Sequence, residues 1–305
     1  MNWYTQEKPQ TPLPALILNT KIDDPSFYKP GPGLKAAVDV ALTLGQPLLL
    51  TGEPGVGKSQ LAYHLAWFID QGKPAVVPVQ TTSVARDLFY RYDALGHFQY
   101  NQNHSTPLSA EELEARFITY QGIGEAIRTQ KRMVVLIDEI DKAPRDLPND
   151  VLTALDRMVF EVPEIRKSYS SDKSQLPIVV ITSNSEKNLP DPFLRRVVYY
   201  HIPFPSDAEL MGILKNKINR LDDGAIEAML QFFNRLRSDE PRLRKKPSTS
   251  ELLLWADLLA RMSFNASGLA DPKNLNPQDK ENLRKSISVL VKTQEDLEAV
   301  YKYIQ

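Results

Sequence analysis

Five short apolar runs cross the first two thirds of the chain, and each ends in glycine, proline or polar residues. They lie within residues 46–52, 75–80, 132–139, 177–184 and 196–204. Continuous apolar runs of this length predict buried strands. Segments with helical spacing lie between them, at residues 34–45, 58–70 and 150–159. Strands that alternate with helices predict an α/β fold with a parallel sheet.

The pattern changes after Pro203 and Pro205, beyond which only helical spacing is found. Two capping boxes of the form S-x-x-E open helices at residues 206–209 and 248–251. Residues 265–278 are expected to form a loop. The chain thus divides into three predicted parts: a Pro-rich irregular segment 1–32, an α/β core 33–204, and an all-helical domain 205–305.

Composition excludes several classes of site. The 305 residues contain no cysteine, which rules out disulfides and Cys-ligated metals. No window offers about 18 uninterrupted apolar residues, and the N-terminus has no signal-peptide pattern, so we expect a cytoplasmic protein without membrane contact. The formal net charge of −1 disfavours nucleic acid as a partner.

Residues 52–59 read GEPGVGKS and match G-x-x-x-x-G-K-[ST] between a predicted strand and a predicted helix. Glycines let successive backbone N–H groups point at one anion, and the new helix adds its positive end. We expect Lys58 to reach the β- and γ-phosphates of a nucleotide and Ser59 to ligate Mg²⁺. The alternative is a Gly-rich turn that arose by chance. The predicted nucleotide-binding residues are Gly52, Glu53, Pro54, Gly55, Val56, Gly57, Lys58, Ser59 and Gln60.

Two further strand ends carry polar side chains suited to hydrolysis. In VVLIDEID (134–141), Asp138 is expected to hold Mg²⁺ through water, and Glu139 to polarise the attacking water as general base. Asn184 ends the next strand and is able to hydrogen-bond both γ-phosphate and water. The alternatives are a solvated acidic strand end and an ordinary turn residue. Asp141 is interpreted as structural.

With these motifs in order, the chain resembles the AAA+ ATPases over residues 20 to 262. GEPGVGKS is similar to Walker A, LIDEID to Walker B, and ITSN to sensor 1; the PFP break precedes a helical lid. Within AAA+, the segments TTSVARDLFYRYDAL (81–95) and LPDPFLRRVVYYHIPFP (189–205) are similar to the MoxR type.

The resemblance implies a P-loop NTPase core with strand order 5-1-4-3-2, helices on both faces, and a helical lid. It also implies ATP and Mg²⁺ as cofactors and a homo-oligomeric, hexameric ring that remodels a protein partner. MoxR-type chains are often paired with a von Willebrand factor A domain protein. No D-x-S-x-S motif of that domain occurs here, so such a partner would be a separate chain.

Two features leave alternatives open. The lid helix that begins PSTSELLLW lacks the arginine that usually serves as sensor 2 in AAA+ proteins. The nearest cations are Arg244, Lys245 and Lys246. They are either candidates for sensor 2 or part of a solvated loop. The aromatic residues of segment 85–120 either pack that insertion against the core or, as the resemblance implies, face the pore of a ring. These aromatics are Phe89, Tyr90, Tyr92, Phe98 and Tyr100.

Arg195 and Arg196 are adjacent, and adjacent helical residues do not share a face. Asp191 lies four residues before Arg195 and is a suitable partner on a helix, whereas Arg196 has no acid at either spacing. The resemblance implies an arginine finger just before the fifth strand, which is Arg196, with Arg195 as its orienting neighbour. The alternative is that both cap the end of a helix.

The predicted site is compatible with three functions. The first is a Mg-dependent ATPase that remodels a protein; the second is an ATP-gated assembly switch with little turnover; the third is a DNA-directed motor. Near-zero net charge argues against the third.

Overall fold

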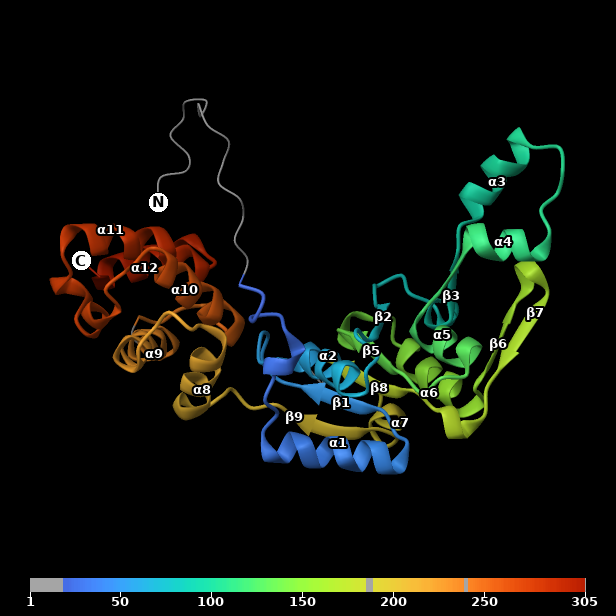
Figure 1. The fold of residues 1–305 in the computed structure, drawn as a ribbon, viewed down its shortest axis with the longest axis horizontal. Coiled ribbons are helices and arrows are strands. Elements are labelled where there is room, and N and C mark those ends of the chain that lie inside the picture. The colour runs from blue at the N-terminus through green and yellow to red at the C-terminus, as the bar shows by residue number, and fades with distance from the viewer. Residues whose placement is uncertain (1–18, 185–188, 239–240, 305) are drawn as a thin grey trace. The chain divides into compact units, whose positions relative to one another are not determined.

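The computed structural model describes residues 19–184, 189–238 and 241–304 (Figure 1). It divides into two compact units. The α/β unit comprises residues 30–53 and 57–203. The helical unit comprises residues 204 onward, together with 54–56 and the segment that ends at Lys29.

A five-stranded parallel sheet forms the centre of the α/β unit. Its strands, in spatial order, are β2 (Ala75–Pro78), β5 (Val134–Asp138), β8 (Ile178–Thr182), β1 (Leu48–Thr51) and β9 (Val198–His201). If these five strands are counted in chain order and read from β9, the order is 5-1-4-3-2, so the predicted topology is confirmed. All five apolar runs found in the sequence form these strands.

Helices cover both faces of this sheet. The helices of the α/β unit are α1 (Pro32–Leu44), α2 (Lys58–Phe68), α3 (Ala94–Asn103), α4 (Ala110–Phe117), α5 (Gly122–Thr129), α6 (Leu147–Arg157) and α7 (Asp191–Leu194). Neighbouring residues of a strand point to opposite faces. Leu49 of β1 belongs to a buried cluster with Ile123 of α5 and Val151 of α6. Leu48, one residue earlier, lies with Leu65 of α2 and residues of α1 on the other face.

Two small antiparallel sheets were missed by the sequence analysis. One pairs β3 (Tyr90–Tyr92) with β4 (Ile118–Tyr120), and the other pairs β6 (Val159–Val162) with β7 (Lys167–Ser170). Helices α3 and α4 lie between β3 and β4 in the chain, and we call residues 90–120 the insertion. These strands have three or four residues with at most two buried, so they carry no apolar run.

A cluster of polar side chains joins the insertion to the β6–β7 hairpin. The hydroxyls of Tyr120 and Tyr169 lie 2.7 and 2.8 Å from Glu114 Oε1 and 2.8 Å from each other. Lys167 Nζ donates to Glu114 Oε2 at 2.7 Å. Burial raises the pKa of Glu114, but hydrogen bonds from Lys167, Tyr120 and Tyr169 outweigh burial and lower that pKa to about 2. Glu114 is therefore ionised at neutral pH and holds α4 to β7.

Packing against the core accounts for some of the aromatic residues of segment 85–120. Phe89 stacks on Phe160 with 5.0 Å between ring centroids, and Tyr90 is buried and donates to Glu164 at 2.9 Å. Burial, helped by this hydrogen bond, raises the pKa of Tyr90 to about 12. Phe98 of α3, by contrast, is 59% exposed. Packing therefore accounts for Phe89 and Tyr90 but not for Phe98.

The helical unit contains α8 (Asp207–Lys217), α9 (Asp223–Arg237), α10 (Thr249–Arg261), α11 (Pro277–Ser286) and α12 (Gln294–Ile304). No strand occurs in its described residues, as predicted. Both predicted capping boxes form, with Ser206 Oγ and Ser248 Oγ each accepting from the N–H of the glutamate three residues on. The expected loop at 265–278 was wrong in part, because it contains η6 (Ala266–Ala270), η7 (Pro272–Asn274) and the start of α11.

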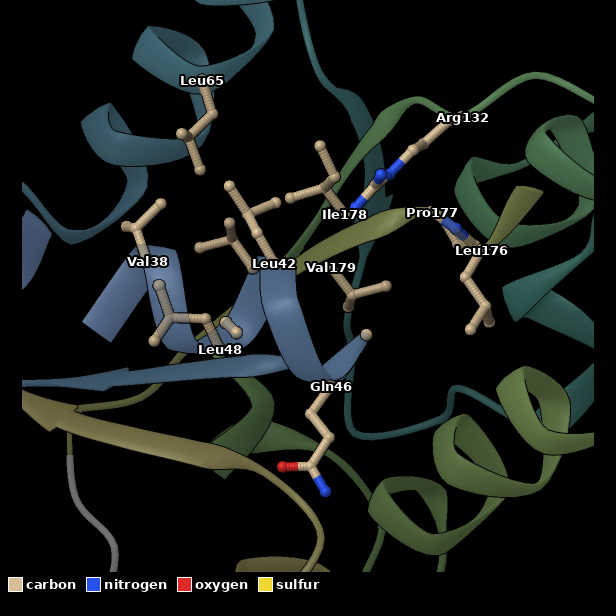
Figure 2. Close-up of a pocket in the computed structure, with 13 residues that line it drawn as sticks. Val38, Leu42, Gln46, Leu48, Leu65, Arg132, Leu176, Pro177, Ile178 and Val179 are labelled. Atoms are coloured by element: carbon tan, nitrogen blue, oxygen red, sulfur yellow. The ribbon is translucent and has the colours of Figure 1, made fainter. Parts of the chain in front are cut away.

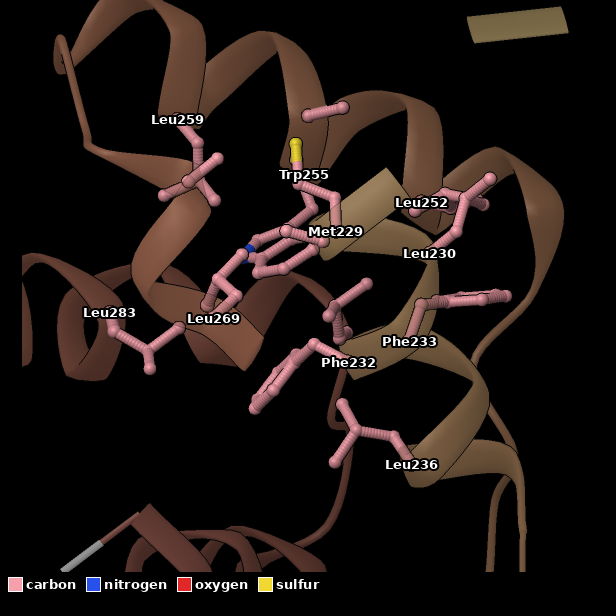
Figure 3. Close-up of a cluster of buried hydrophobic side chains, with 14 of the residues drawn as sticks. Met229, Leu230, Phe232, Phe233, Leu236, Leu252, Trp255, Leu259, Leu269 and Leu283 are labelled. Carbon is pink, nitrogen blue, oxygen red and sulfur yellow. The ribbon is translucent and has the colours of Figure 1, made fainter. Parts of the chain in front are cut away.

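Large side chains from all five of these helices contribute to the core of this unit, and Figure 3 shows part of that cluster. Trp255 of α10 is fully buried and stacks on Phe232 of α9, with 5.7 Å between ring centroids. Its indole N–H donates to Ser286 Oγ of α11 at 3.1 Å. Ser286 is itself fully buried, so this hydrogen bond satisfies a polar group that water does not reach.

The described segment before α1 has no helix or strand apart from the short η1 (Pro25–Phe27), and it is tied to the helical unit. Asn19 Nδ2 donates to Lys217 O at 3.0 Å and to Asp257 Oδ1 at 3.1 Å. Lys217 is buried, and its Nζ donates to Ile22 O. Burial lowers the pKa of this lysine, although nearby acidic residues oppose the shift. The predicted irregular segment 1–32 therefore holds contacts from Asn19 onward, and α1 begins at Pro32; residues 1–18 lie outside the described part.

No helix in the described residues is long and apolar enough to cross a membrane.

Candidate nucleotide site

Three neighbouring strands end at one edge of the parallel sheet, and each delivers polar residues there. The register pairs Leu50 of β1 with Thr182 of β8, and Ile137 of β5 with Ile181 of β8. The residues after β1, at the end of β5 and after β8 therefore lie side by side. These are the three segments in which the sequence predicted the phosphate loop, the acidic pair and Asn184.

The phosphate loop turns directly into α2. Gly57 precedes the helix with φ 95° and ψ 20°, a left-handed conformation that other residues adopt at a cost. Helix α2 begins at Lys58, so its first backbone N–H groups have no partner within the helix. Such an end is suited to a phosphate group. Of the remaining predicted residues, Val56 is buried, and Gln60 Oε1 is buried without a hydrogen-bond partner among the described residues.

Lys58 contacts both the loop and the end of β8. Its Nζ donates to Gly52 O at 2.8 Å, to Glu53 O at 3.1 Å and to Asn184 Oδ1 at 2.9 Å. Burial lowers the pKa of Lys58, and the acidic side chains of residues 138, 141 and 139 oppose the shift. Lys58 and Asn184, which are 126 residues apart in the chain, thus meet at this edge of the sheet.

Ser59 and Asp138 form the second contact between the loop and the acidic strand end. Ser59 Oγ donates to Asp138 Oδ1 at 2.9 Å. Hydroxyl and carboxylate oxygens are hard ligands of the kind Mg²⁺ prefers, and protein Mg²⁺ sites often use one or two such groups together with substrate phosphates. The pair therefore fits a nucleotide-bound Mg²⁺. No group of three or more His, Cys, Asp or Glu suited to a metal occurs in the described residues.

Thr182 contacts both acidic residues, although no role for it is predicted from the sequence. Its hydroxyl donates to Asp138 Oδ1 and accepts from the backbone N–H of Glu139 at 2.9 Å. Glu139 itself adopts a left-handed conformation, with φ 57° and ψ 50°. The only signal in the sequence was the position of Thr182 at a strand end.

The remaining polar residues of the site are partly exposed. Glu139 Oε2 accepts from Lys142 Nζ at 2.5 Å, and the side chains of the pair are 44% and 55% exposed. The hydrogen bond to Glu139 raises the pKa of Lys142. Asp141 Oδ1 accepts from the backbone N–H of Asn184 at 3.2 Å. Asp141 thus orients the loop after β8, which fits its structural interpretation.

The two arginines stand apart from this cluster of contacts. Arg195 and Arg196 are exposed between α7 and β9, and neither side chain forms a hydrogen bond or ion pair with the described residues. The expected ion pair of Asp191 with Arg195 is not formed. Helix α7 ends at Leu194, and only the backbone N–H of Arg195 contacts Asp191, donating to its carbonyl oxygen at 3.2 Å.

The cations considered for sensor 2 lie in the helical unit. Arg244, Lys245 and Lys246 are exposed, and Arg244 forms an ion pair with Glu295 at 2.6 Å. The backbone N–H groups of Arg244 and Lys245 donate to Asp296. These contacts anchor the segment to α12, and they fit the solvated-loop alternative.

A narrow apolar pocket lies at the opposite edge of the sheet (Figure 2). Leu48 and Ile178, the first residues of β1 and β8, line it together with Val38, Leu42, Leu65 and Arg132. The phosphate loop follows the other end of β1. None of the predicted site residues lines this pocket, so it is separate from the nucleotide site.

Residues 47–197 match the model of the AAA domain (dynein-related subfamily). No curated protein matches the sequence significantly. Among solved structures, the chain is similar to domain III of the Thermotoga maritima replication initiation protein DnaA, with 14% identity and a TM-score of 0.47, over 89% of this chain and 98% of that one. The domain match and the strand order together give the α/β unit the AAA+ P-loop fold.

Proposed function

We propose that the protein is a Mg-dependent ATPase that assembles into a homo-oligomeric ring and remodels a protein partner. The observation that supports it best is the meeting of Lys58, Ser59, Asp138 and Asn184 at one edge of the sheet. These side chains come from three separate strand ends, and each type suits one task of phosphoryl transfer.

In this proposal Lys58 and the start of α2 bind the phosphates, while Ser59 and Asp138 hold Mg²⁺, which neutralises charge on the phosphate oxygens. Glu139 accepts a proton from the attacking water, and Asn184 orients that water. Bound Mg²⁺ would supply positive charge at the phosphates, and the backbone N–H groups at the start of α2 would stabilise charge that develops in the transition state.

We predict that Lys58→Ala abolishes ATP binding, whereas Glu139→Gln keeps binding and stops hydrolysis. The first change removes the cation that contacts the phosphates, and the second removes only the proton acceptor. Fluorescent nucleotide titration measures binding, and phosphate release measures turnover. Wild-type turnover in Glu139→Gln would contradict its role as general base.

Arg196 is proposed as an arginine finger that reaches the nucleotide of a neighbouring subunit, with Arg195 as a secondary neighbour. Its exposure and its lack of a side-chain partner among the described residues suit that role. We predict that Arg196→Ala and Lys58→Ala are each inactive alone but recover part of the activity when mixed, because some interfaces then combine an intact loop with an intact finger.

The mixing experiment is followed by steady-state phosphate release at several subunit ratios. Mixed rings that stay inactive, although both variants assemble, would argue against a finger acting between subunits. Size-exclusion chromatography with ATP confirms assembly of each variant and gives the ring size, which we propose is six.

The protein partner is proposed to be a separate chain, with a von Willebrand factor A domain protein as the MoxR-type candidate. Phe98 and Leu95 of α3 are 59% and 66% exposed and lie three residues apart, so they offer an apolar contact at the insertion. Glu139→Gln loaded with ATP should retain the partner during affinity purification, and Lys58→Ala is the matched control.

Two other functions use the same residues. An ATP-gated assembly switch predicts ring formation with negligible turnover, and a DNA-directed motor predicts stimulation by DNA. Steady turnover that rises with a partner polypeptide, and not with DNA, favours the remodelling ATPase.

A further inference from the structure

We propose that Thr182 is a positioning residue that fixes both acidic residues of the nucleotide site through one hydroxyl group. The inference rests on the proposed function, because it assigns to Asp138 and Glu139 their roles toward Mg²⁺ and water. Thr182 is 1% exposed and ends β8, directly beside the end of β5.

The direction of both hydrogen bonds follows from the groups involved. A hydroxyl group has one proton to donate and two lone pairs that accept. The backbone N–H of Glu139 is able only to donate, so it uses a lone pair of Thr182 Oγ1 at 2.9 Å. The single hydroxyl proton therefore goes to the carboxylate of Asp138, which accepts it on Oδ1.

At Asp138 this contact sets the orientation of the carboxylate. Ser59 and Thr182 both donate to the same oxygen, Oδ1. No described side chain donates to Oδ2, so both hydroxyl contacts that orient the carboxylate are made at Oδ1. Without Thr182, Ser59 alone would hold the carboxylate, and Ser59 is itself a proposed ligand of Mg²⁺.

At Glu139 the contact holds a backbone conformation that is unfavourable for a residue with a side chain. A non-glycine residue in the left-handed region needs support from its surroundings. Thr182 Oγ1 supplies it by accepting from the Glu139 N–H, which fixes the peptide between the two acidic residues. The direction in which the Glu139 side chain leaves the backbone depends on this peptide.

Threonine suits this task better than serine in one respect. Its β-branched side chain has few rotamers in a strand, so the hydroxyl is held in one direction. Serine keeps the hydroxyl but not that restriction, whereas valine keeps the shape and loses the hydroxyl. The two substitutions separate hydrogen bonding from packing.

The test compares Thr182→Val, Thr182→Ser and the control Thr51→Val. Thr51 is also 1% exposed and ends the adjacent strand β1, but its hydroxyl contacts Tyr199 and His201 rather than the acidic residues. Two quantities are measured: the gain in affinity for fluorescent ADP when Mg²⁺ replaces EDTA, and kcat and KM for ATP.

We expect Thr182→Val to lose most of the Mg²⁺-dependent gain and to lower kcat by about 10- to 100-fold, the effect typical of a group that orients a metal ligand. Affinity for ADP in EDTA should stay near wild type. Thr182→Ser should restore most of both quantities, and Thr51→Val should keep the wild-type Mg²⁺-dependent gain. If Thr182→Val does not fold, Thr182→Ala replaces it.

A wild-type Mg²⁺-dependent gain and kcat in folded Thr182→Val would overturn the inference, and so would an equal loss in Thr51→Val. A wild-type protein that binds Mg-ADP but does not hydrolyse ATP would refute the proposed ATPase alone, because the affinity measurement still tests Thr182. A protein that binds no nucleotide would overturn both.

Discussion

Trp255 illustrates how one buried polar atom constrains the helical unit. Its ring packs among apolar residues, while its N–H requires an acceptor, which Ser286 supplies. We predict that Ser286→Ala lowers the free energy of unfolding of this unit by about 1–3 kcal/mol, because a buried donor is left unsatisfied. Urea unfolding followed by tryptophan fluorescence measures the change.

Ser288→Ala is the control for that measurement, because Ser288 lies two residues further on and is exposed. We expect its effect to stay within about 0.5 kcal/mol. An equal loss in both variants would show that the hydrogen bond to Trp255 is not the cause.

At this scale, the sequence located the polar side chains that meet at the sheet edge where their pattern lies within one short segment. Lys58 and Ser59 stand in an eight-residue motif, and Asp138 follows an apolar run. The role of Thr182 was missed because its partners are set by the register between β5 and β8, which no single segment specifies. The pairing of Asp191 with Arg195 failed because α7 is only four residues long.

Among the elements, Glu114 of α4 forms hydrogen bonds with Lys167 and Tyr169 of β7, and we call these contacts the tie. The tie depends on an ionised carboxylate. The folded-state pKa of Glu114, about 2, is below its ordinary value of 4.5. A carboxyl group with a lowered pKa stabilises the fold above its ordinary pKa, and this contribution is lost as the pH falls toward the folded-state value. The tie is therefore fully present at neutral pH and weakens below about pH 4.5.

We predict that Glu114→Gln destabilises the α/β unit by about 1–3 kcal/mol at pH 7, because Lys167 and the two tyrosines lose a charged acceptor. The difference from wild type should shrink as the pH is lowered from 4.5. Thermal unfolding at a series of pH values checks both statements.

Glu111→Gln is the matched control, since Glu111 lies on the same helix and faces the same lysine at 3.9 Å but is 76% exposed. Exposed ion pairs contribute little, so a change below about 0.5 kcal/mol is expected. A pH-independent difference between wild type and Glu114→Gln would contradict the assignment of the tie to the carboxylate charge.

Prediction of elements followed the strength of the apolar signal. The five strands of the central sheet are continuous apolar runs and were all found. Strands β3, β4, β6 and β7 were not, since they are stabilised by one another and by contacts such as Phe89 with Phe160. Residues 266–274 form short 3₁₀ helices but were predicted to be a loop. Their buried residues Ala266 and Leu269 are held by tertiary packing, which the local sequence does not reveal.

At the scale of the whole molecule, the chain is organised as two compact units with separate cores. The proposed chemistry needs more than one copy if Arg196 serves a neighbouring nucleotide. The cooperativity of ATP hydrolysis would then report on assembly. The activity per subunit should rise with protein concentration below the dissociation constant of the ring.

The binding of residues 19–22 to α8 and α10 has a mechanical consequence. A load attached ahead of Asn19, such as a fused domain or a surface tether, would pull first on the helical unit through Asn19 and Lys217. Only after those bonds yielded would tension reach α1 and the sheet. An N-terminal fusion would therefore report on movements of the helical unit, and an attachment at the exposed end of α3 would report on the insertion.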